Sequence, residues 1–321
     1  MSRATVTAHP NIAMVKYWGK RDLNKNLPSV PSLSMTLSGF HTVTTVHWGS
    51  KSDQVFAQER PAAVDFAQRA LEFLNHIDPD RPPCEIRTSN NFPTAAGLAS
   101  SSSGFAALAL AGLAASGRQV STTQASVLAR RGSGSACRSV FGGFVEWRLG
   151  SLEDGSDSHA IPVASADHWP LAMVVAVVSS QKKSIGSTQG MLKTQATSPL
   201  YPHFVDSAPH DVATAKAAIL NKDLSTLGQI MESSTFKMHA TMHTTQPPII
   251  YWQPGTTACI QTVFALRKQG VEAWLTMDAG PNVKVLCRQA DQDTVRKALA
   301  PHAETTHILH PGPAPTVVTD G

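Results

Sequence analysis

The sequence predicts a mixed α+β protein, built as one large domain or as two lobes. Its 321 residues are enough to bury a substantial core. A hydrophobic fraction of 42% and a charged fraction of 16% are ordinary for a globular chain. Strand-like and helix-like stretches are interspersed throughout, and the composition shifts near residue 181. This shift gives a candidate boundary between residues 1–181 and 182–321.

Strands and helices are expected to be interspersed in the first half of the chain. Alternating residues predict strands, the continuous apolar run at 171–178 predicts a fully buried strand, and apolar residues at helical spacing predict helices. Gly117 and Gly132 are suited to the ends of helices. The expected strands are 5–7, 12–15, 42–48, 84–88, 141–148 and 171–178. The expected helices are 62–77, a helix that starts in the serine run near residue 100 and continues through 115, and 122–131.

The second half is expected to be mainly helical. Pro199, Pro202 and Pro209 predict a loop, because proline interrupts helices. The expected helices are 211–220, 223–243 and 256–268, followed by a strand at 272–277. The residues from Pro311 onward are expected to form an unpacked tail.

Composition and charge argue against several classes of protein. The formal net charge of +4 is too small to indicate nucleic-acid binding, and the aromatic fraction of 6% disfavours a base-stacking surface. The longest apolar run, 105–115, is too short to span a bilayer. The four cysteines are far apart, so reduced thiols are expected rather than a disulfide framework. Because no leader-like segment opens the sequence, a cytoplasmic protein is expected.

A glycine turn that leads into a run of serines lies at 91–104. Gly97 allows the backbone to approach a ligand closely, and the serine hydroxyls can cap the helix that follows. A helix N-terminus of this kind binds anions such as phosphate through its backbone N–H groups. The alternative is a well-capped core helix. The sequence contains no Walker pattern and no G-x-G-x-x-G pattern.

Two further segments carry clustered polar and charged residues. Segment 16–21 holds three cations and a tyrosine, which would either bind phosphates or extend from a strand end into solvent. Ser133, Ser135 and Arg138 could converge on one anion, with the arginine fork suited to a carboxylate. A polar turn with a structural arginine is the alternative for this second segment.

Single residues in the second half admit two interpretations each. Lys182 could reach the oxygens of a transferring phosphate, or Lys182 and Lys183 could only cap a strand in solvent. From the sequence alone, Asp278 is typical of a turn aspartate that bonds its own backbone. His239 and His243 have the spacing of two metal ligands on one helix face, but the sequence offers no third ligand. A metal site there is not expected.

Several blocks of the sequence together resemble a known family. The segment 93–102 resembles the phosphate loop of the GHMP kinase superfamily. Five further blocks resemble mevalonate diphosphate decarboxylase: NIAMVKYWGKRD at 11–22, GSGSACRS at 132–139, FGGFVEW at 141–147, GSTQGM at 186–191 and DAGPN at 278–282. These blocks occur in the family's order and span nearly the whole chain, which makes the resemblance specific.

The resemblance implies a fold and an activity. The implied fold is the two-lobed α+β GHMP kinase fold, with an N-terminal lobe like ribosomal protein S5, a ferredoxin-like C-terminal lobe and the active site in the cleft between them. The implied reaction is the ATP-dependent decarboxylation of (R)-5-diphosphomevalonate to isopentenyl diphosphate, with ADP, phosphate and carbon dioxide as the other products. Mg²⁺ held mainly by phosphates and water, and a homodimer, are also implied.

The resemblance also implies roles for individual residues. Asp278 would orient or deprotonate the C3 hydroxyl, Lys16 would lie beside the reacting centre, and Arg138 would bind the C1 carboxylate. The diphosphate end of the substrate would contact Tyr17, Lys20, Ser133, Ser135 and Ser187. ATP would contact Gly97, Ala99, Ser100, Ser101, Ser102 and Lys182.

Three other functions remain open at this stage. The first two share the fold and differ in substrate or product: a 5-phosphomevalonate decarboxylase and a mevalonate 3-kinase. The third is a non-catalytic ligand sensor, which the joint presence of Lys16, Arg138 and Asp278 disfavours. Many members of the family have Asn-Ser where this chain has Val30-Pro31, so any contact made by that asparagine is absent here.

Overall fold

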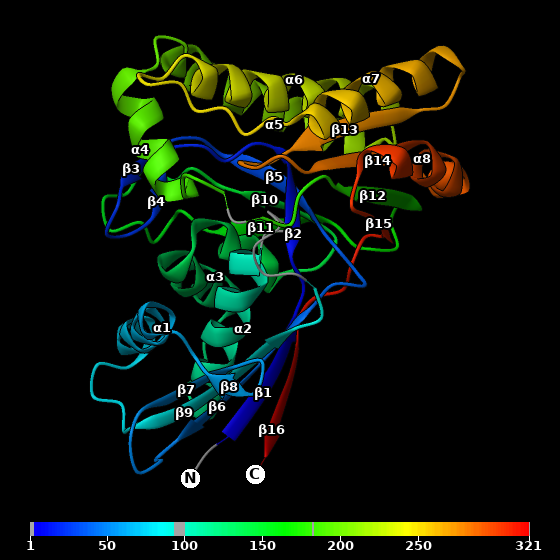
Figure 1. Cartoon of the computed structure of the whole chain (residues 1–321). Coiled ribbons are helices and arrows are strands. Elements are labelled where there is room, and N and C mark those ends of the chain that lie inside the picture. Colours follow the sequence, from blue (N-terminus) through cyan, green and yellow to red (C-terminus); the bar gives the residue numbers. More distant parts are fainter. Residues whose placement is uncertain (1–2, 93–99, 182, 321) are drawn as a thin grey trace.

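The structure, a computed structural model, describes residues 3–92, 100–181 and 183–320 (Figure 1). Up to residue 177 the elements are β1 (Arg3–Ala8), β2 (Asn11–Val15), β3 (Lys20–Asp22), β4 (Leu27–Pro28), β5 (Ser32–Thr36), β6 (Thr42–Trp48), β7 (Gln54–Ala57), β8 (Arg60–Pro61), α1 (Val64–Ile77), β9 (Cys84–Asn90), α2 (Ser100–Ala115), α3 (Thr122–Gly132), the 3-10 helix η1 (Gly134–Val140), β10 (Phe144–Trp147), β11 (Ala160–Ala164) and β12 (Leu171–Val177). Beyond it are α4 (Ser187–Thr197), α5 (Tyr201–Leu220), α6 (Leu224–His243), α7 (Pro254–Lys268), β13 (Ala273–Met277), β14 (Val283–Arg288), η2 (Gln289–Asp291), α8 (Gln292–Leu299), η3 (Ala300–His302), β15 (Thr305–Leu309) and β16 (Thr316–Asp320). This mixture confirms the predicted α+β class.

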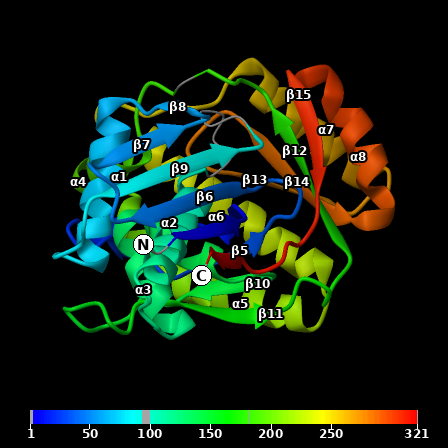
Figure 2. The same cartoon turned by 90° about the horizontal axis from the view of Figure 1, so that it is seen from below.

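A six-stranded sheet forms the lower part of the molecule in Figure 1, in the order β16-β1-β6-β9-β7-β8. Figure 2 shows β6, β9 and β7 side by side from below. Helices α1 and α2 pack against this sheet, and their apolar residues form one core with Val6, Val46 and Ile86. The buried side of α2 consists mostly of alanine, serine and glycine, and these small residues let the helix approach the strands closely.

A second, four-stranded sheet lies in the middle of the molecule, in the order β11-β10-β5-β2. Every residue of β2 and β5 is buried, because other elements cover both faces of these strands. Their apolar side chains share a core with α5, α6 and one face of β12. The site-bearing segment after β2 is therefore anchored in the centre of the protein.

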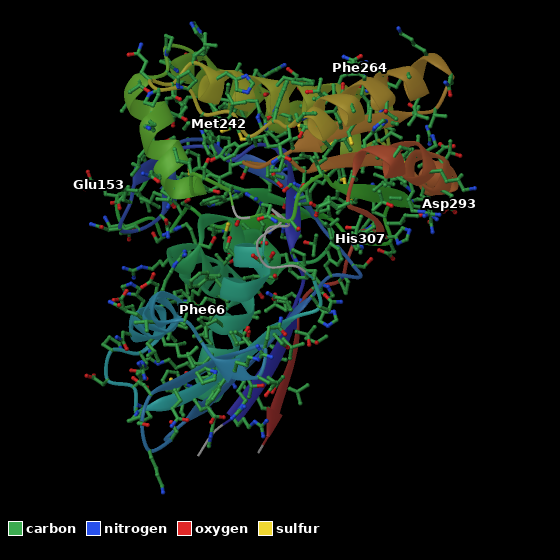
Figure 3. The ribbon with its side chains drawn as sticks, in the orientation of Figure 1. Phe66, Glu153, Met242, Phe264, Asp293 and His307 are labelled. Atoms are coloured by element: carbon green, nitrogen blue, oxygen red, sulfur yellow. The ribbon has the colours of Figure 1, made fainter. Side chains whose placement is uncertain are left out.

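A third sheet in the upper part has the order β13-β14-β12-β15 and is antiparallel throughout. Alternate residues of β12 pack on opposite sides: Met173 and Val175 face the core shared with α5 and α6, whereas Val174 and Ala176 face the core shared with α7 and α8. Burial on both faces explains the continuous apolar run that predicted a fully buried strand here. Met242, near the end of α6, packs in another core with residues of α4 and α5 (Figure 3).

The predicted regular elements are confirmed with shifts of a few residues at their ends. The helix predicted at 62–77 begins at Val64, and the strand predicted at 84–88 extends to Asn90. Among the described residues, no helix is long and apolar enough to cross a membrane.

Two expectations about irregular segments were wrong. Most of the segment punctuated by prolines belongs to α5, although Pro199 lies in a turn just before the helix. Pro202 occupies the first turn of α5, a position that tolerates proline, and Pro209 lies inside the helix. Packing of Phe204, Ala208 and Val212 against the core supports this helix in spite of Pro209. The supposed tail is not unpacked, because Thr316–Asp320 forms β16 and pairs antiparallel with β1.

Candidate active site

A cleft of about 810 Å³ lies where the start of α2, η1, the segment after β2, the start of α4 and the β13–β14 turn meet. It brings together residues from several segments that are far apart in the sequence. The predicted site residues that line it are Lys16, Tyr17, Lys20, Ser100, Ser101, Ser133, Ser135, Arg138, Ser187 and Asp278.

Asp278 lies in the cleft wall between two lysines. Lys16 Nζ donates to Asp278 Oδ1 at 2.8 Å, and Lys284 Nζ donates to Asp278 Oδ2 at 3.1 Å. Both lysine side chains are 1% exposed, whereas that of Asp278 is 29% exposed. The carboxylate is thus held from behind by two buried cations and opens onto the cleft.

Local strand geometry explains how these groups meet. Asp278 follows β13 in the five-residue turn to β14, and the register pairs Thr276 with Lys284. Since side chains alternate along a strand, Asp278 continues the face of Thr276, where its diagonal neighbour is Lys284. Lys16 follows an irregularity in the pairing of β2 with β5 near Ala13. Its Nζ also donates to the carbonyl of Ala13 at 2.8 Å, which fixes the lysine against its own strand end.

The proton affinities of this cluster reflect burial and mutual charge. Burial acts to raise the pKa of Asp278, but the charges of Lys16 and Lys284 outweigh it and hold this pKa well below its usual range. Burial lowers the pKa of Lys16 to about 8; the attraction of Asp278 opposes this change, while the nearby cations Lys284 and Arg138 add to it. Asp278 is therefore ionised at neutral pH, and Lys16 is poised to lose its proton in mildly alkaline solution.

Arg138 is fully buried in η1 and is held by neutral partners. Its Nε donates to Asn11 Oδ1 at 3.1 Å, and its Nη1 donates to Ser32 Oγ at 2.6 Å. The side-chain nitrogen of Asn11 donates to the Ser135 carbonyl and to Ser139 Oγ. Asn11 therefore fixes η1 on both sides of Arg138 in the sequence. Within the described part of the chain, Arg138 forms no ion pair with a carboxylate, so its charge is available to an anion in the cleft.

Tyr17 and Lys20 form another part of the wall. The Tyr17 hydroxyl is buried without a hydrogen-bond partner among the described residues, and burial raises the pKa of this phenol. An unpaired buried donor in a cleft wall is a group that a ligand can satisfy. Lys20 Nζ donates to Asn26 Oδ1 at 2.5 Å and to Thr188 Oγ1 at 3.4 Å, which places it near the start of α4.

The serines lie close together at the junction of α2 and η1. Ser133 Oγ lies 3.3 Å from Ser101 Oγ and 3.5 Å from Ser135 Oγ. Ser102 does not line the cleft: it is fully buried, and its hydroxyl accepts a hydrogen bond from the backbone N–H of Asn11 at 3.3 Å. Ser102 therefore joins α2 to β2 behind the cleft wall.

Lys183, which follows the predicted site residue Lys182, belongs to the site. Lys183 Nζ donates to Ser187 Oγ at 2.8 Å and to the Ala279 carbonyl at 2.9 Å, and its side chain lines the cleft. This contact corrects the interpretation of Lys183 as a solvent-facing strand cap. The predicted ATP contacts Gly97, Ala99 and Lys182 lie outside the described residues.

Several functional residues were not predicted as site residues: Asn11, Arg69 and Lys183, which line the cleft, and Lys284, which contacts Asp278. A signal existed for Lys284, because a lysine inside the apolar run Val283–Leu286 of a buried strand requires a partner. No comparable signal existed for Arg69, which reaches the cleft from α1 and donates to the Gly132 carbonyl at 3.1 Å.

The histidine pair on α6 has a different environment from a metal site. His239 Nδ1 accepts a hydrogen bond from Trp252 Nε1 at 2.9 Å, so one of its ring nitrogens is already engaged. Burial and the positive charge of Lys16 lower the pKa of His239 to about 3, which keeps the ring neutral. No group of three or more potential metal-binding side chains occurs in the described part of the chain.

Comparisons with known families cover almost the entire chain. Residues 8–160 match the diphosphomevalonate decarboxylase-like N-terminal domain, and residues 173–310 match the mevalonate 5-diphosphate decarboxylase C-terminal domain. The diphosphomevalonate decarboxylase of Aspergillus fumigatus is 40% identical, over 94% of this chain and 82% of that protein. The enzyme of the same name from Saccharomyces cerevisiae is also 40% identical, over 87% of this chain and 76% of that protein.

Solved structures agree with these matches. The crystal structure of mevalonate diphosphate decarboxylase from Staphylococcus aureus has a TM-score of 0.93 at 34% identity and covers 99% of this chain and 98% of that chain. A structure of MDDEF in complex with MVAPP, AMPPCP and magnesium has a TM-score of 0.92 at 36% identity and covers 99% of both chains. The GHMP kinase fold expected from the sequence is thereby confirmed. The chain belongs to the mevalonate diphosphate decarboxylase family.

Proposed function

We propose that this protein catalyses the ATP-dependent decarboxylation of (R)-5-diphosphomevalonate to isopentenyl diphosphate. The observation that carries the proposal is the Asp278 carboxylate, which is held between two buried lysines and faces a cleft that also contains Arg138 and the start of α2. Proteins similar to this chain carry that activity in their names, and one similar structure holds MVAPP, AMPPCP and magnesium. The site geometry supports a role for each part of these ligands.

The substrate has two anionic ends, and the cleft offers a cation for each. Arg138, which lines the cleft, would bind the C1 carboxylate, because its planar guanidinium matches a carboxylate and it keeps its charge at any physiological pH. Tyr17, Lys20, Ser133, Ser135 and Ser187 would hold the diphosphate. The unpaired hydroxyl of Tyr17 and the ammonium of Lys20 support this assignment. With both ends held, the C3 hydroxyl would lie at Asp278.

ATP would bind on the α2 side of the cleft. The N-terminal turn of a helix presents backbone N–H groups and the positive end of the helix dipole, and Ser100 and Ser101 line the cleft at this turn of α2. Lys183 lines the same cleft and would balance charge on the phosphoryl group that is transferred. We propose the same phosphate-binding role for Gly97, Ala99 and Lys182. Ser102 would support the turn from behind.

The proposed chemistry has two stages. In the first, the C3 hydroxyl oxygen bonds to the γ-phosphorus of ATP, ADP leaves, and Asp278 accepts the hydroxyl proton. In the second, the C3–O bond breaks with loss of phosphate, and the C1–C2 bond breaks with loss of carbon dioxide. The electron pair of the C1–C2 bond forms the new double bond. Phosphorylation is needed because hydroxide is a very poor leaving group from a tertiary carbon.

Low proton affinity at Asp278 fits this sequence of events. A carboxylate held between Lys16 and Lys284 is a weak base toward a resting alcohol. It is nevertheless always ionised, so it can accept a hydrogen bond from the hydroxyl and orient the oxygen toward the phosphorus. As the P–O bond forms, the hydroxyl becomes far more acidic, and the proton can then pass to Asp278.

Magnesium fits the oxygen donors of this cleft. Mg²⁺ usually retains several water ligands and is bound by substrate phosphates with few protein oxygens. The hydroxyls of Ser100 and Ser101, beside the proposed phosphate site, are suitable donors. When bound, the ion neutralises charge on the phosphates; Lys183 and the α2 N-terminus would share this task.

A direct assay separates this function from its rivals. Purified protein, ATP and Mg²⁺ are incubated with diphosphomevalonate, 5-phosphomevalonate or mevalonate, and ADP and carbon dioxide are both measured. We expect equal amounts of both products, with diphosphomevalonate the best substrate. ADP without carbon dioxide would identify a 3-kinase, preference for the monophosphate would identify a phosphomevalonate decarboxylase, and neither product would indicate a sensor.

We also infer the assembly and setting of the protein from the family. A cytoplasmic homodimer that binds neither nucleic acid nor membranes is proposed, with a lobe boundary at residues 181 and 182. The small net charge supports the absence of nucleic acid. Light scattering after size-exclusion chromatography tests the dimer, since a monomer at micromolar concentration would contradict it.

A further inference from the structure

Lys284 is a buried charge whose presence the fold alone does not explain. It lies in β14 between Val283 and Val285, and all three residues are buried. An apolar side chain of similar volume in such a strand is often neutral or stabilising, since burying a lysine carries a desolvation cost. A methionine at this position could not hold Asp278 Oδ2, which Lys284 Nζ contacts at 3.1 Å.

We propose that Lys284 is a positioning residue for phosphoryl transfer, which fixes the plane and the ionisation of the Asp278 carboxylate. Lys16 holds Oδ1 and Lys284 holds Oδ2, so the carboxylate cannot rotate about its Cβ–Cγ bond without breaking a charged hydrogen bond. Each oxygen keeps a further lone pair for the substrate hydroxyl. This inference rests on the proposed function, because it assigns the carboxylate the role of receiving that hydroxyl.

The β13–β14 hairpin gives Lys284 the rigidity that a positioning residue needs. Thr276 pairs with Lys284 across the two strands, and the Thr276 hydroxyl lies 3.0 Å from Thr235 Oγ1 on α6. The turn itself is closed by a hydrogen bond from the Gly280 N–H to the Asp278 carbonyl at 2.8 Å. Lys284 and Asp278 are therefore carried by one hairpin, whereas Lys16 arrives from the distant β2.

Other titratable groups surround the carboxylate. They are Lys16 after β2, Arg138 in η1, Lys183 before α4 and the neutral His239 in α6. Lys284 repels the charged form of Lys16 and so contributes to lowering the pKa of Lys16 to about 8. Removing the charge of Lys284 therefore raises the pKa of Lys16 as well as that of Asp278.

These two pKa changes allow a test that distinguishes a positioning role of Lys284 from a purely structural one. The measurement is kcat/KM for diphosphomevalonate at saturating ATP and Mg²⁺, from about pH 6.5 to about pH 10, a range that spans the shifted and ordinary lysine pKa values. In the wild type, activity should fall along an alkaline limb near pH 8, where Lys16 loses its proton. In Lys284→Met, the limb should move up by about one pH unit, and kcat should fall about tenfold or more.

Three further variants make the result decisive. Lys284→Gln is a second neutral variant, in case the methionine does not fold, and should show the same upward shift. Lys284→Arg keeps the charge and should leave the limb near its wild-type position. Lys216→Met removes a different ion pair, between α5 and Glu146 of β10, and should leave the profile unchanged.

The outcomes also separate this inference from the proposed function. If the wild type forms no ADP and carbon dioxide from diphosphomevalonate, the proposed function fails. If the wild type is active and both neutral variants lose activity equally at every pH with the limb unmoved, Lys284 is structural and the inference is overturned. The inference would also be overturned if both neutral variants kept the activity of the wild type and their alkaline limb did not move.

Discussion

At the scale of single residues, the site depends on an excess of buried positive charge. Lys16, Lys284 and Arg138 are each almost fully buried, and Asp278 is the carboxylate among them. Such a cluster is expensive to desolvate unless it is paired, so an anionic ligand completes it. The cluster therefore favours a substrate with more than one negative charge.

The role of Asp278 gives the first prediction at this scale. Asp278→Asn should lower kcat by about 10² or more, because the group that receives the proton is lost. Asp278→Glu keeps the charge but displaces the carboxylate by one methylene group, and should also lose most activity. ADP release measures turnover, and calorimetric titration with a non-hydrolysable ATP analogue checks that nucleotide binding survives. Near-normal turnover in Asp278→Asn would remove Asp278 from its role.

The same carboxylate gives a prediction for stability against pH. The pKa of Asp278 is lower in the folded protein than its ordinary value, so its ion pairs stabilise the fold above the unfolded pKa of about 4. This stabilisation is lost as pH falls toward the folded pKa. The difference in unfolding free energy between wild type and Asp278→Asn should be largest near neutrality and shrink in acid. Urea unfolding at several pH values measures it, and a difference that grows in acid would contradict the sign.

At the scale of elements, sequence patterns predicted the helices and strands that depend mainly on residues close together in the sequence. Helical spacing located α1, and an apolar run located β12, because each pattern records which face is buried. Prolines misled the prediction of α5, because tertiary packing outweighed the local cost of Pro209. Lys284 was overlooked because its partner is set by the register of a hairpin, and no single-residue pattern contains that register.

Gly134, the first residue of η1, supports a prediction at the element scale. A Cβ at Gly134 would lie 2.8 Å from the Tyr17 hydroxyl oxygen and 2.9 Å from the Trp147 ring. Gly134→Ala should push the Tyr17 side chain aside, since the end of a side chain yields more easily than backbone. We expect KM for diphosphomevalonate to rise about threefold to tenfold, the loss of about one hydrogen bond, with kcat less affected.

A matched glycine in a helix provides the control for this change. A Cβ at Gly104 in α2 meets nothing within 4 Å, so Gly104→Ala should leave KM for diphosphomevalonate unchanged. Steady-state kinetics of the two variants and their melting temperatures are compared. An unchanged KM in a folded Gly134→Ala protein would show that Tyr17 does not contact the substrate.

At the scale of the whole molecule, the site depends on contacts that the sequence could not place. Lys16 and Asp278 are 262 residues apart, and the backbone N–H of Lys16 donates to Ser234 Oγ on α6 at 2.9 Å. Blocks of family resemblance indicated which residues belong together, but strand order and register determine the distances between them. The same non-local pairing explains why the C-terminal segment was mistaken for a tail: β16 finds its partner in β1, at the other end of the chain.

The C-terminal segment joins two sheets and gives the last prediction. Gly312 donates its N–H to the Thr36 carbonyl at 2.7 Å and accepts from the Gly143 N–H at 2.8 Å, while β16 pairs with β1 at the edge of the six-stranded sheet. Removing residues 316–321 should cost several backbone hydrogen bonds at about 0.5–1.5 kcal/mol each and lower Tm by about 5–10 °C. It should also promote aggregation, since β1 becomes an exposed edge.

A second truncation separates the strand from the connection before it. Removing residues 310–321 also deletes the Gly312 bonds near β5 and β10, so its Tm should fall further. Figure 1 shows β16 at the end of the molecule remote from α4 and the β13–β14 hairpin, which border the cleft. The shorter truncation should therefore keep wild-type kcat at 25 °C, a temperature well below its expected melting point for a domain of ordinary stability. Equal Tm values for the wild type and both truncations would show that the C-terminal segment does not stabilise the fold. A lower kcat in the shorter truncation, if that protein is fully folded, would show that β16 affects the cleft.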